Sequence, residues 1–170
     1  MINYDVQGVG PGYKARLDWV AKQFAKLNVQ LEVRNTDYNR FQDKMRKGSA
    51  QFFFWGWLAD YPDPENFLFL LYGPNSKAKF DGENSSNFAH PEFDQLFYRM
   101  KDLDDTPERA AMIGRMIEIM QDELPMLYGW SEEFGGAYHQ WVGNGKPSNI
   151  IRDSLPYLKI DAALRTSKIK

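Results

Sequence analysis

The sequence contains no cysteine and only two histidines, His90 and His139. The absence of cysteine excludes disulfide bonds, cysteine nucleophiles and cysteine-ligated metals. The two histidines stand far apart in the chain and match no metal-binding spacing, so the sequence predicts no metal site. A phosphate-binding glycine motif and a nucleophile elbow are also missing, and we expect neither a cofactor nor catalytic residues.

An excess of one charge and a long apolar run are missing as well. The formal net charge is −2, without the basic surplus of a nucleic-acid-binding protein, so we expect no nucleic-acid partner. The longest apolar run, residues 52–59, is far shorter than the roughly 18 residues that cross a membrane. No signal peptide opens the sequence, because a strand-like pattern follows Met1 at once. We therefore expect a piece of a longer protein, from which the signal peptide is absent.

The first third of the chain alternates between strand and helix patterns. Strands are predicted over residues 2–6, 29–34 and 51–57, the last as a continuous apolar run buried on both faces. Helical spacing separates them, with Thr36 or Asp37 as the cap of the second helix and Phe41 and Met45 on its inner face. Two successive strand–helix–strand units predict an α/β fold with a mixed, mainly parallel sheet flanked by helices.

The rest of the chain is less regular. Residues 73–91 read as a long surface loop, in which Asn84-Ser85-Ser86 fits a glycosylation triplet. A third helix is predicted from Phe93 to Leu103, and a fourth begins at Pro107 after a Thr106 cap. The expected inner face of the fourth helix consists of Ala110, Ile113, Met116, Ile117 and Met120. Two further strands are predicted, at 126–130 and 156–160.

Aromatic side chains concentrate in residues 52–72, which hold nine of the 26 aromatics. Core packing explains most of them, but Trp57 and Tyr61 stand where the third strand ends. In open α/β sheets, ligands bind outside the carboxyl ends of the strands. Asp60 lies between these two residues, and a carboxylate among aromatics needs a cation. That cation is either a ligand or a lysine or arginine of this chain, and a capping role for Asp60 is a further possibility.

Two other classes of function compete with ligand binding. A carbohydrate-active hydrolase would use two carboxylates, chosen from Asp60, Asp63 and Glu65. These acids crowd one tight loop, whereas glycosidases place their carboxylates on opposite sides of the sugar bond, so this reading is disfavoured. A protein-interaction module would instead use the aromatic residues as an exposed apolar surface.

The stretch 55-WGWLADYPDPENFL-68 resembles a signature of the bacterial extracellular solute-binding proteins of family 5, the receptors for peptides and related solutes of ABC importers. The resemblance covers most of residues 2–130. It extends to the segments Tyr13 to Arg34, Tyr38-Asn39-Arg40-Phe41, Asn87 to Phe93, Thr106-Pro107-Glu108-Arg109 and Asp122-Glu123-Leu124-Pro125.

The resemblance implies a periplasmic-binding-protein-like lobe of a two-lobed receptor, and not an enzyme. Residues 1–135 would be the carboxy-terminal ligand-binding lobe, and residues 136–170 would cross back toward a missing first lobe. The implied partners are a peptide or other small-molecule ligand, ABC transporter permease subunits and that first lobe. The implied location is the periplasm, or the cell surface for a lipoprotein.

The resemblance also implies the ligand-binding residues Trp57, Asp60 and Tyr61. In peptide-binding members, the aspartate of a Trp-x-x-Asp motif pairs with the α-ammonium of the peptide, and Trp57 and Asp60 occupy those two positions here. A retained aspartate favours a ligand that carries a free amine.

Overall fold

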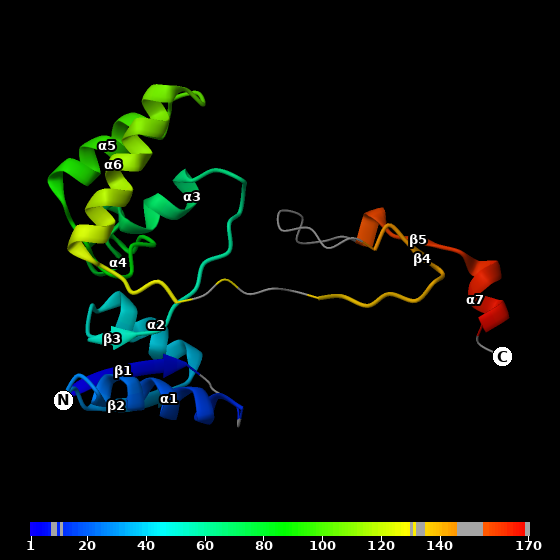
Figure 1. Ribbon diagram of the computed structural model, residues 1–170, viewed down its shortest axis with the longest axis horizontal. Helices are drawn as coiled ribbons and strands as arrows, with labels where there is room; N and C mark the ends of the chain where they lie inside the picture. The colour runs from blue at the N-terminus through cyan, green and yellow to red at the C-terminus, as the bar shows by residue number, and fades with distance from the viewer. Residues whose placement is uncertain (8–9, 11, 130, 132–134, 146–154, 169–170) are drawn as a thin grey trace. The chain divides into compact units, whose positions relative to one another are not determined.

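Three predicted strands form one parallel sheet in the computed structural model (Figure 1). They are β1 (Ile2–Gln7), β2 (Leu31–Thr36) and β3 (Phe52–Phe53), in the order β2-β1-β3. Helix α1 (Tyr13–Ala25) connects β1 to β2, and α2 (Tyr38–Arg46) connects β2 to β3. Both connections therefore join parallel strands through a helix, as the sequence pattern predicted.

The structure describes residues 1–7, 10, 12–129, 131, 135–145 and 155–168. It divides into two units. The first comprises Met1–Leu58 and Pro64–Met126, and the second comprises Ala59–Asp63 and Leu127–Lys170. No helix among the described residues is long and apolar enough to cross a membrane.

The two faces of β1 pack differently, because successive side chains of a strand point to opposite sides. Tyr4 and Val6 are buried with Leu17 of α1. Asp5 points to the other face, where its carboxylate pairs with the ammonium of Lys44 from α2. Helices α1 and α2 therefore cover opposite faces of the sheet.

Local signals define the start and end of α2. The Asp37 carboxylate accepts a hydrogen bond from the Arg40 amide at 3.1 Å, so Asp37 caps the helix. Phe41 and Met45 are buried, as predicted. Gly48 has φ +60° and follows the last turn, where a side chain would strain the backbone.

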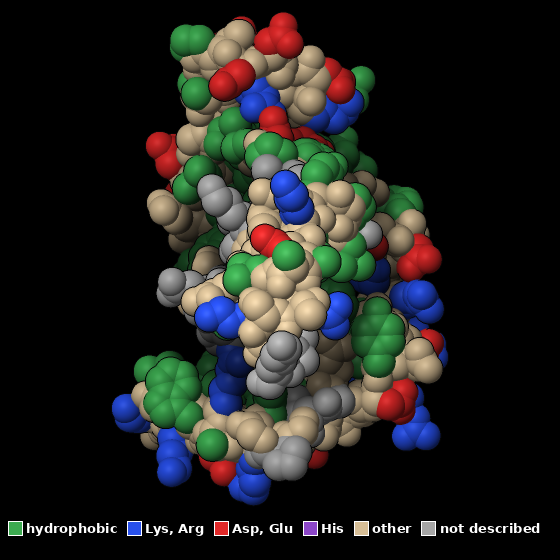
Figure 2. All heavy atoms as spheres, turned by 90° about the vertical axis from the view of Figure 1, so that its right-hand side faces the viewer, with side chains coloured by type: hydrophobic (Ala, Val, Ile, Leu, Met, Phe, Trp, Pro, Cys, Tyr) green, Lys and Arg blue, Asp and Glu red, His purple; other side chains and the backbone are tan. Residues whose placement is uncertain are grey.

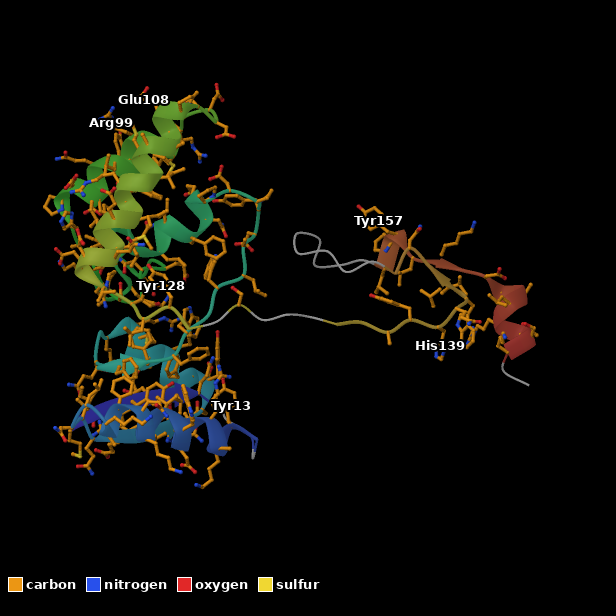
Figure 3. The ribbon with its side chains drawn as sticks, viewed as in Figure 1. Tyr13, Arg99, Glu108, Tyr128, His139 and Tyr157 are labelled. Atoms are coloured by element: carbon orange, nitrogen blue, oxygen red, sulfur yellow. The ribbon has the colours of Figure 1, made fainter. Side chains whose placement is uncertain are left out.

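Helices α3 (Glu65–Leu68), α5 (Pro91–Met100) and α6 (Pro107–Glu123) surround a second apolar core of the first unit. The short 3₁₀ turn Phe69–Leu71 continues α3. The buried side chains of this core are Leu68, Leu71, Phe93, Phe97, Met100, Met112, Met116 and Ile119. Arg99 of α5 and Glu108 of α6, labelled in Figure 3, pair at 3.3 Å on the surface beside it.

The predicted inner face of α6 is confirmed at the buried Met116, and Ile113 and Met120 pack partly buried against the same core. It is wrong at Ala110 and Ile117. The buried residues are Arg109, Met112, Met116 and Ile119, whereas Ala110 and Ile117 are exposed. Apolar residues occur nearly all around this helix, so their spacing does not select one face. Arg109 settles the matter, because its guanidinium donates to the Met100 carbonyl at 3.3 Å and its stem lies among the core side chains.

The surface loop predicted at 73–91 is also wrong. It contains the 3₁₀ turn Gly73–Asn75 and helix α4 (Lys77–Phe80). Asn84 is fully buried, and its amide donates to the carbonyls of Tyr72 and Phe88 at 3.1 and 2.8 Å. The asparagine of the glycosylation triplet therefore connects two loop segments inside the protein, and both hydrogens of its side-chain amide are used in these hydrogen bonds.

Three predicted strands are shorter than expected or absent. Only Phe52–Phe53 of the run 51–57 pairs in the sheet, and residues 126–129 form no strand, while Trp130 lies outside the described residues. In the second unit β5 is Lys159–Ile160, preceded by a 3₁₀ turn, and it pairs antiparallel with β4 (Val142–Gly143). Helix α7 (Ala162–Lys168) follows β5. The described sheet of the first unit is thus wholly parallel, and the antiparallel pair is a separate one.

Candidate ligand-binding site

The strand order creates a topological switch point between β1 and β3. Chain connections leave β1 toward β2 on one side, and β3 lies on the other. In open α/β sheets, ligands bind outside the carboxyl ends of the strands at such a point. The segment that leaves β3 here is residues 54–64, which includes all three predicted site residues.

Trp57 belongs to the first unit, and its ring is held in place by that unit. The indole N–H donates to the Asn66 side-chain oxygen at 3.0 Å, and Asn66 itself is buried in α3. The ring of Phe69 meets the indole edge-on at 5.3 Å. The polar tip of Trp57 is therefore already satisfied, and a ligand would meet only the remaining apolar surface of the ring.

Asp60 and Tyr61 belong to the second unit, in its segment Ala59–Asp63. Both are exposed, with 44% of the Tyr61 surface accessible. The Asp63 amide donates to the Tyr61 carbonyl at 2.9 Å, which makes this segment a tight turn. An exposed carboxylate beside an exposed phenol ring is chemically suited to an ammonium group, which the ring face also attracts.

The three predicted residues are thus placed within different units, and their joint role remains a prediction. Trp57 is fixed by α3, and Asp60 and Tyr61 share the turn that precedes it in the sequence. Figure 2 shows apolar side chains that reach the surface between charged ones. The exposed apolar residues of this segment and of α3 include Leu58, Tyr61 and Phe67.

Sequence reasoning missed Arg16, which joins two aromatic rings beside the start of this segment. Its guanidinium carbon lies 5.2 Å from the ring centre of Tyr13 and 5.3 Å from that of Phe54. Tyr13 begins α1 and is labelled in Figure 3. Tyr13 and Arg16 are three residues apart on one helix, and this spacing indicates that their side chains can meet. It gives no indication of the contact between Arg16 and Phe54.

Burial raises the pKa of the neighbouring Tyr4 hydroxyl. The nearby Tyr13 raises that pKa further, and the charge of Arg16 opposes both effects. Tyr4 therefore stays neutral at physiological pH, and the nearby positive charge is the guanidinium of Arg16, which lies close to the rings of Tyr13 and Phe54.

The α2 side of the same edge has another aromatic contact. Trp55 stacks on Phe41 with 5.7 Å between ring centres and 18° between planes. The indole Nε1 of Trp55 is buried without a hydrogen-bond partner, as are Gln7 Oε1 and Thr36 Oγ1. Within the described residues no group of three histidine or acidic side chains is arranged to hold a metal ion.

The sheet is parallel, has the order β2-β1-β3 and carries helices on both faces. An aromatic segment leaves it at the switch point. These features define a lobe of the periplasmic-binding-protein class. The chain superposes on the periplasmic binding protein DppA from Helicobacter pylori, solved in complex with the peptide STSA, with a TM-score of 0.64. The match covers 73% of this chain and 24% of that one at 22% identity, and it establishes the fold.

Residues 2–79 match the family described as bacterial extracellular solute-binding proteins, family 5, in its middle part. The match confirms, over this region, the resemblance inferred from the sequence. The oligopeptide-binding protein OppA of Bacillus subtilis is 32% identical over 100 residues, 59% of this chain and 17% of that protein. The dipeptide-binding protein of Escherichia coli is 24% identical over 117 residues, 69% of this chain. The chain spans only about a fifth of the length of these relatives, 17% and 22%.

Proposed function

We propose that this chain forms a ligand-binding lobe of the solute-binding component of an ABC importer. In this proposal it captures peptides, or similar solutes with a free amine, for transport across the membrane. The observation that carries the proposal is the exposed Asp60 carboxylate in the segment that follows the parallel sheet, within a region of family 5 sequence. The names of the relatives, which bind oligopeptides and dipeptides, support the same class of ligand.

In the proposed complex, Asp60 accepts hydrogen bonds from the ligand ammonium. Closure against a first lobe, which would be supplied by the rest of the receptor, removes water from this pair. A charge-assisted hydrogen bond is strong in such a dry cleft, and its loss leaves a buried charge without a partner. Trp57 and Tyr61 would contribute apolar contact area to the ligand.

The remaining roles follow from the same proposal. Residues 1–135 form the lobe, residues 136–170 return toward the first lobe, and permease subunits receive the loaded receptor. The location is the periplasm or, for a lipid-anchored receptor, the cell surface. The ligand is released unchanged, so turnover of any ligand would instead favour the hydrolase that uses Asp60, Asp63 or Glu65.

The test is Asp60→Asn in the complete receptor, with alanine peptides of two to five residues as probes. The change keeps the size of the side chain and removes its charge, so burial of the ligand ammonium loses about 2–5 kcal/mol. Affinity measured by calorimetry should fall about 30-fold to several thousandfold. The matched control Asp63→Asn, in the same turn, should change it less than twofold.

Acetylation of the peptide amine supplies the second arm. It should weaken binding to the unmutated receptor about as much as Asp60→Asn does. The two changes together should cost much less than their sum, because both remove one interaction. An affinity of Asp60→Asn within twofold of the unmutated receptor would make Asp60 a turn residue and refute this site.

A further inference from the structure

Among the described residues of the first unit, three polar side-chain atoms are buried without a hydrogen-bond partner: Gln7 Oε1, Thr36 Oγ1 and Trp55 Nε1. Each of these residues is partly exposed as a whole, so only its polar atom is covered. Nearly all buried polar groups in native proteins are hydrogen-bonded, and an unsatisfied one is destabilising. Three such atoms therefore require an explanation, and their positions in the sheet provide one.

The three residues stand in one row across the carboxyl edge of the sheet. Gln7 and Thr36 are register partners at the last pair of β1 and β2. Phe53 of β3 is level with Asp5, and Trp55 follows two residues later, just past the end of β3. The row Thr36–Gln7–Trp55 thus joins the last residues of β2 and β1 to the segment that leaves β3 at the switch point between β1 and β3, two strands that Figure 1 shows side by side.

All three residues belong to the α2 face. Asp5, two residues before Gln7 on the same strand, pairs with Lys44 of α2, and Trp55 stacks on Phe41 of α2. Neighbouring strands are about 4.8 Å apart, so the row is about 10 Å long. That length corresponds to roughly three residues of extended peptide.

The chemistry of the row is uncharged and complementary. The indole N–H can only donate, the glutamine carbonyl can only accept, and the threonine hydroxyl can do both. The ionised strand residues of this face are paired: Asp5 with Lys44, and Arg34, the register partner of Asp5, with Glu32 at 3.4 Å. A free carboxylate or ammonium would be buried here without a counter-charge, whereas an amide offers one donor and one acceptor and needs none.

We propose that Gln7, Thr36 and Trp55 form a hydrogen-bonding subsite for the uncharged amide groups of a bound ligand. This inference rests on the proposed function, in which the ligand is a peptide or a similar solute. Side-chain rotation at the partly exposed residues Gln7 and Thr36 turns their polar atoms toward the ligand. Trp55, held by its stack on Phe41, donates from the edge of its ring.

Thr36→Val and Trp55→Phe in the complete receptor test whether these polar groups bind a ligand or stabilise the fold. Both variants keep the shape of the side chain and remove the unpartnered polar group. Because that group has no partner without ligand, the Tm of the unliganded receptor should stay unchanged or rise. The affinity for tri-alanine should fall about threefold to tenfold for each variant.

Two matched tryptophan variants serve as controls. Trp57→Phe removes an indole N–H that has a partner, Asn66, and should lower the Tm of the unliganded receptor. Trp19→Phe changes an exposed ring on α1 and should alter neither Tm nor affinity. Gln7 is tested with an ester analogue of tri-alanine that lacks one amide N–H. The unmutated receptor should bind this ester more weakly than tri-alanine. Gln7→Met should bind the ester and tri-alanine with equal affinity.

The outcomes discriminate cleanly. If Thr36→Val and Trp55→Phe lower the Tm of the unliganded receptor and leave the affinity within twofold, the three atoms hold an internal water and the subsite is refuted. Unchanged affinity with unchanged Tm refutes it as well, while the proposed function stands. If the unmutated receptor binds no alanine peptide of two to five residues, the proposed function fails, and this inference fails with it.

Discussion

The two units of this chain differ in what holds them together. Every buried apolar side chain of the described residues lies in the first unit, where two clusters form around the sheet and around α5 and α6. The described residues of the second unit include no buried residue, and large apolar side chains such as Tyr157, labelled in Figure 3, are exposed there. A two-stranded ribbon without a buried face is marginally stable in water. We therefore expect the stability of the first unit to come from its own apolar cores. We expect the second unit to need contacts from outside itself to be stable.

The largest expected effect is at the centre of the helical core. Phe97→Ala removes a buried ring that packs on Tyr72 at 4.5 Å between centres. The cavity and the lost burial should lower the free energy of unfolding by about 3–5 kcal/mol. Urea titration measures this, with Tyr98→Ala, the 65% exposed neighbour on α5, expected within about 0.5 kcal/mol of the unmutated chain. Similar losses for both variants would contradict the assigned core.

A smaller loss is expected beneath the sheet edge. Asp5→Asn breaks the pair with Lys44 at a position where only 2% of Asp5 is accessible. The Lys44 ammonium can still turn toward solvent, so the expected loss is about 2 kcal/mol rather than the full cost of an isolated buried charge. Asp43→Asn, which breaks the exposed pair with Lys47, is the control and should cost less than about 0.5 kcal/mol. Equal effects would show that the Asp5 pair is no more important than a surface pair.

A still smaller effect depends on pH. Hydrogen bonds from Arg115 at 2.7 and 3.1 Å hold the pKa of the Glu92 carboxyl below its ordinary value of 4.5. The unfolded chain then takes up the proton first, so the stabilisation is present above that ordinary value and is lost as the pH falls through the lower, folded value. Glu92→Gln should therefore lower the Tm near neutral pH slightly and reduce the fall of Tm below about pH 4.5.

Salt provides the control for that pair, because both side chains are exposed. At 1 M sodium chloride the difference between Glu92→Gln and the unmutated chain should shrink at every pH. A difference that persists unchanged at high salt would mean that the ion pair between α5 and α6 is not its source.

The smallest effect is expected in the second unit. Ile160→Ser replaces a side chain of β5 that is 52% exposed, so the main unfolding transition should shift by less than about 0.5 kcal/mol. Urea titration followed by circular dichroism measures it. A loss comparable to that of Phe97→Ala would overturn the contrast between the units, because it would place Ile160 in a core.

Local patterns predicted much of the first unit. The strands predicted at 2–6 and 29–34 are found at 2–7 and 31–36. Of the two predicted caps of α2, Asp37 is the one used, and the predicted inner residues Phe41 and Met45 are buried. The resemblance to family 5 was also detectable from the sequence, because the signature lies in one continuous stretch, and residues 2–79 match the family. The site residues Trp57, Asp60 and Tyr61 come from that stretch, and their role in binding remains to be measured.

Only the tertiary structure decided which chemically equivalent residues are inside. On α6, isoleucines and methionines occur on several sides, and the bond of Arg109 to the Met100 carbonyl selects the buried one. Asn84 is internal because the carbonyls of Tyr72 and Phe88 both accept hydrogen bonds from it, and Arg16 meets Phe54 because β3 returns beside β1. The pairing of Thr36 with Gln7 likewise exists only through strand register. These features depend on how separate turns, helices and strands pack together, and local spacing carries no information about which of their residues will meet.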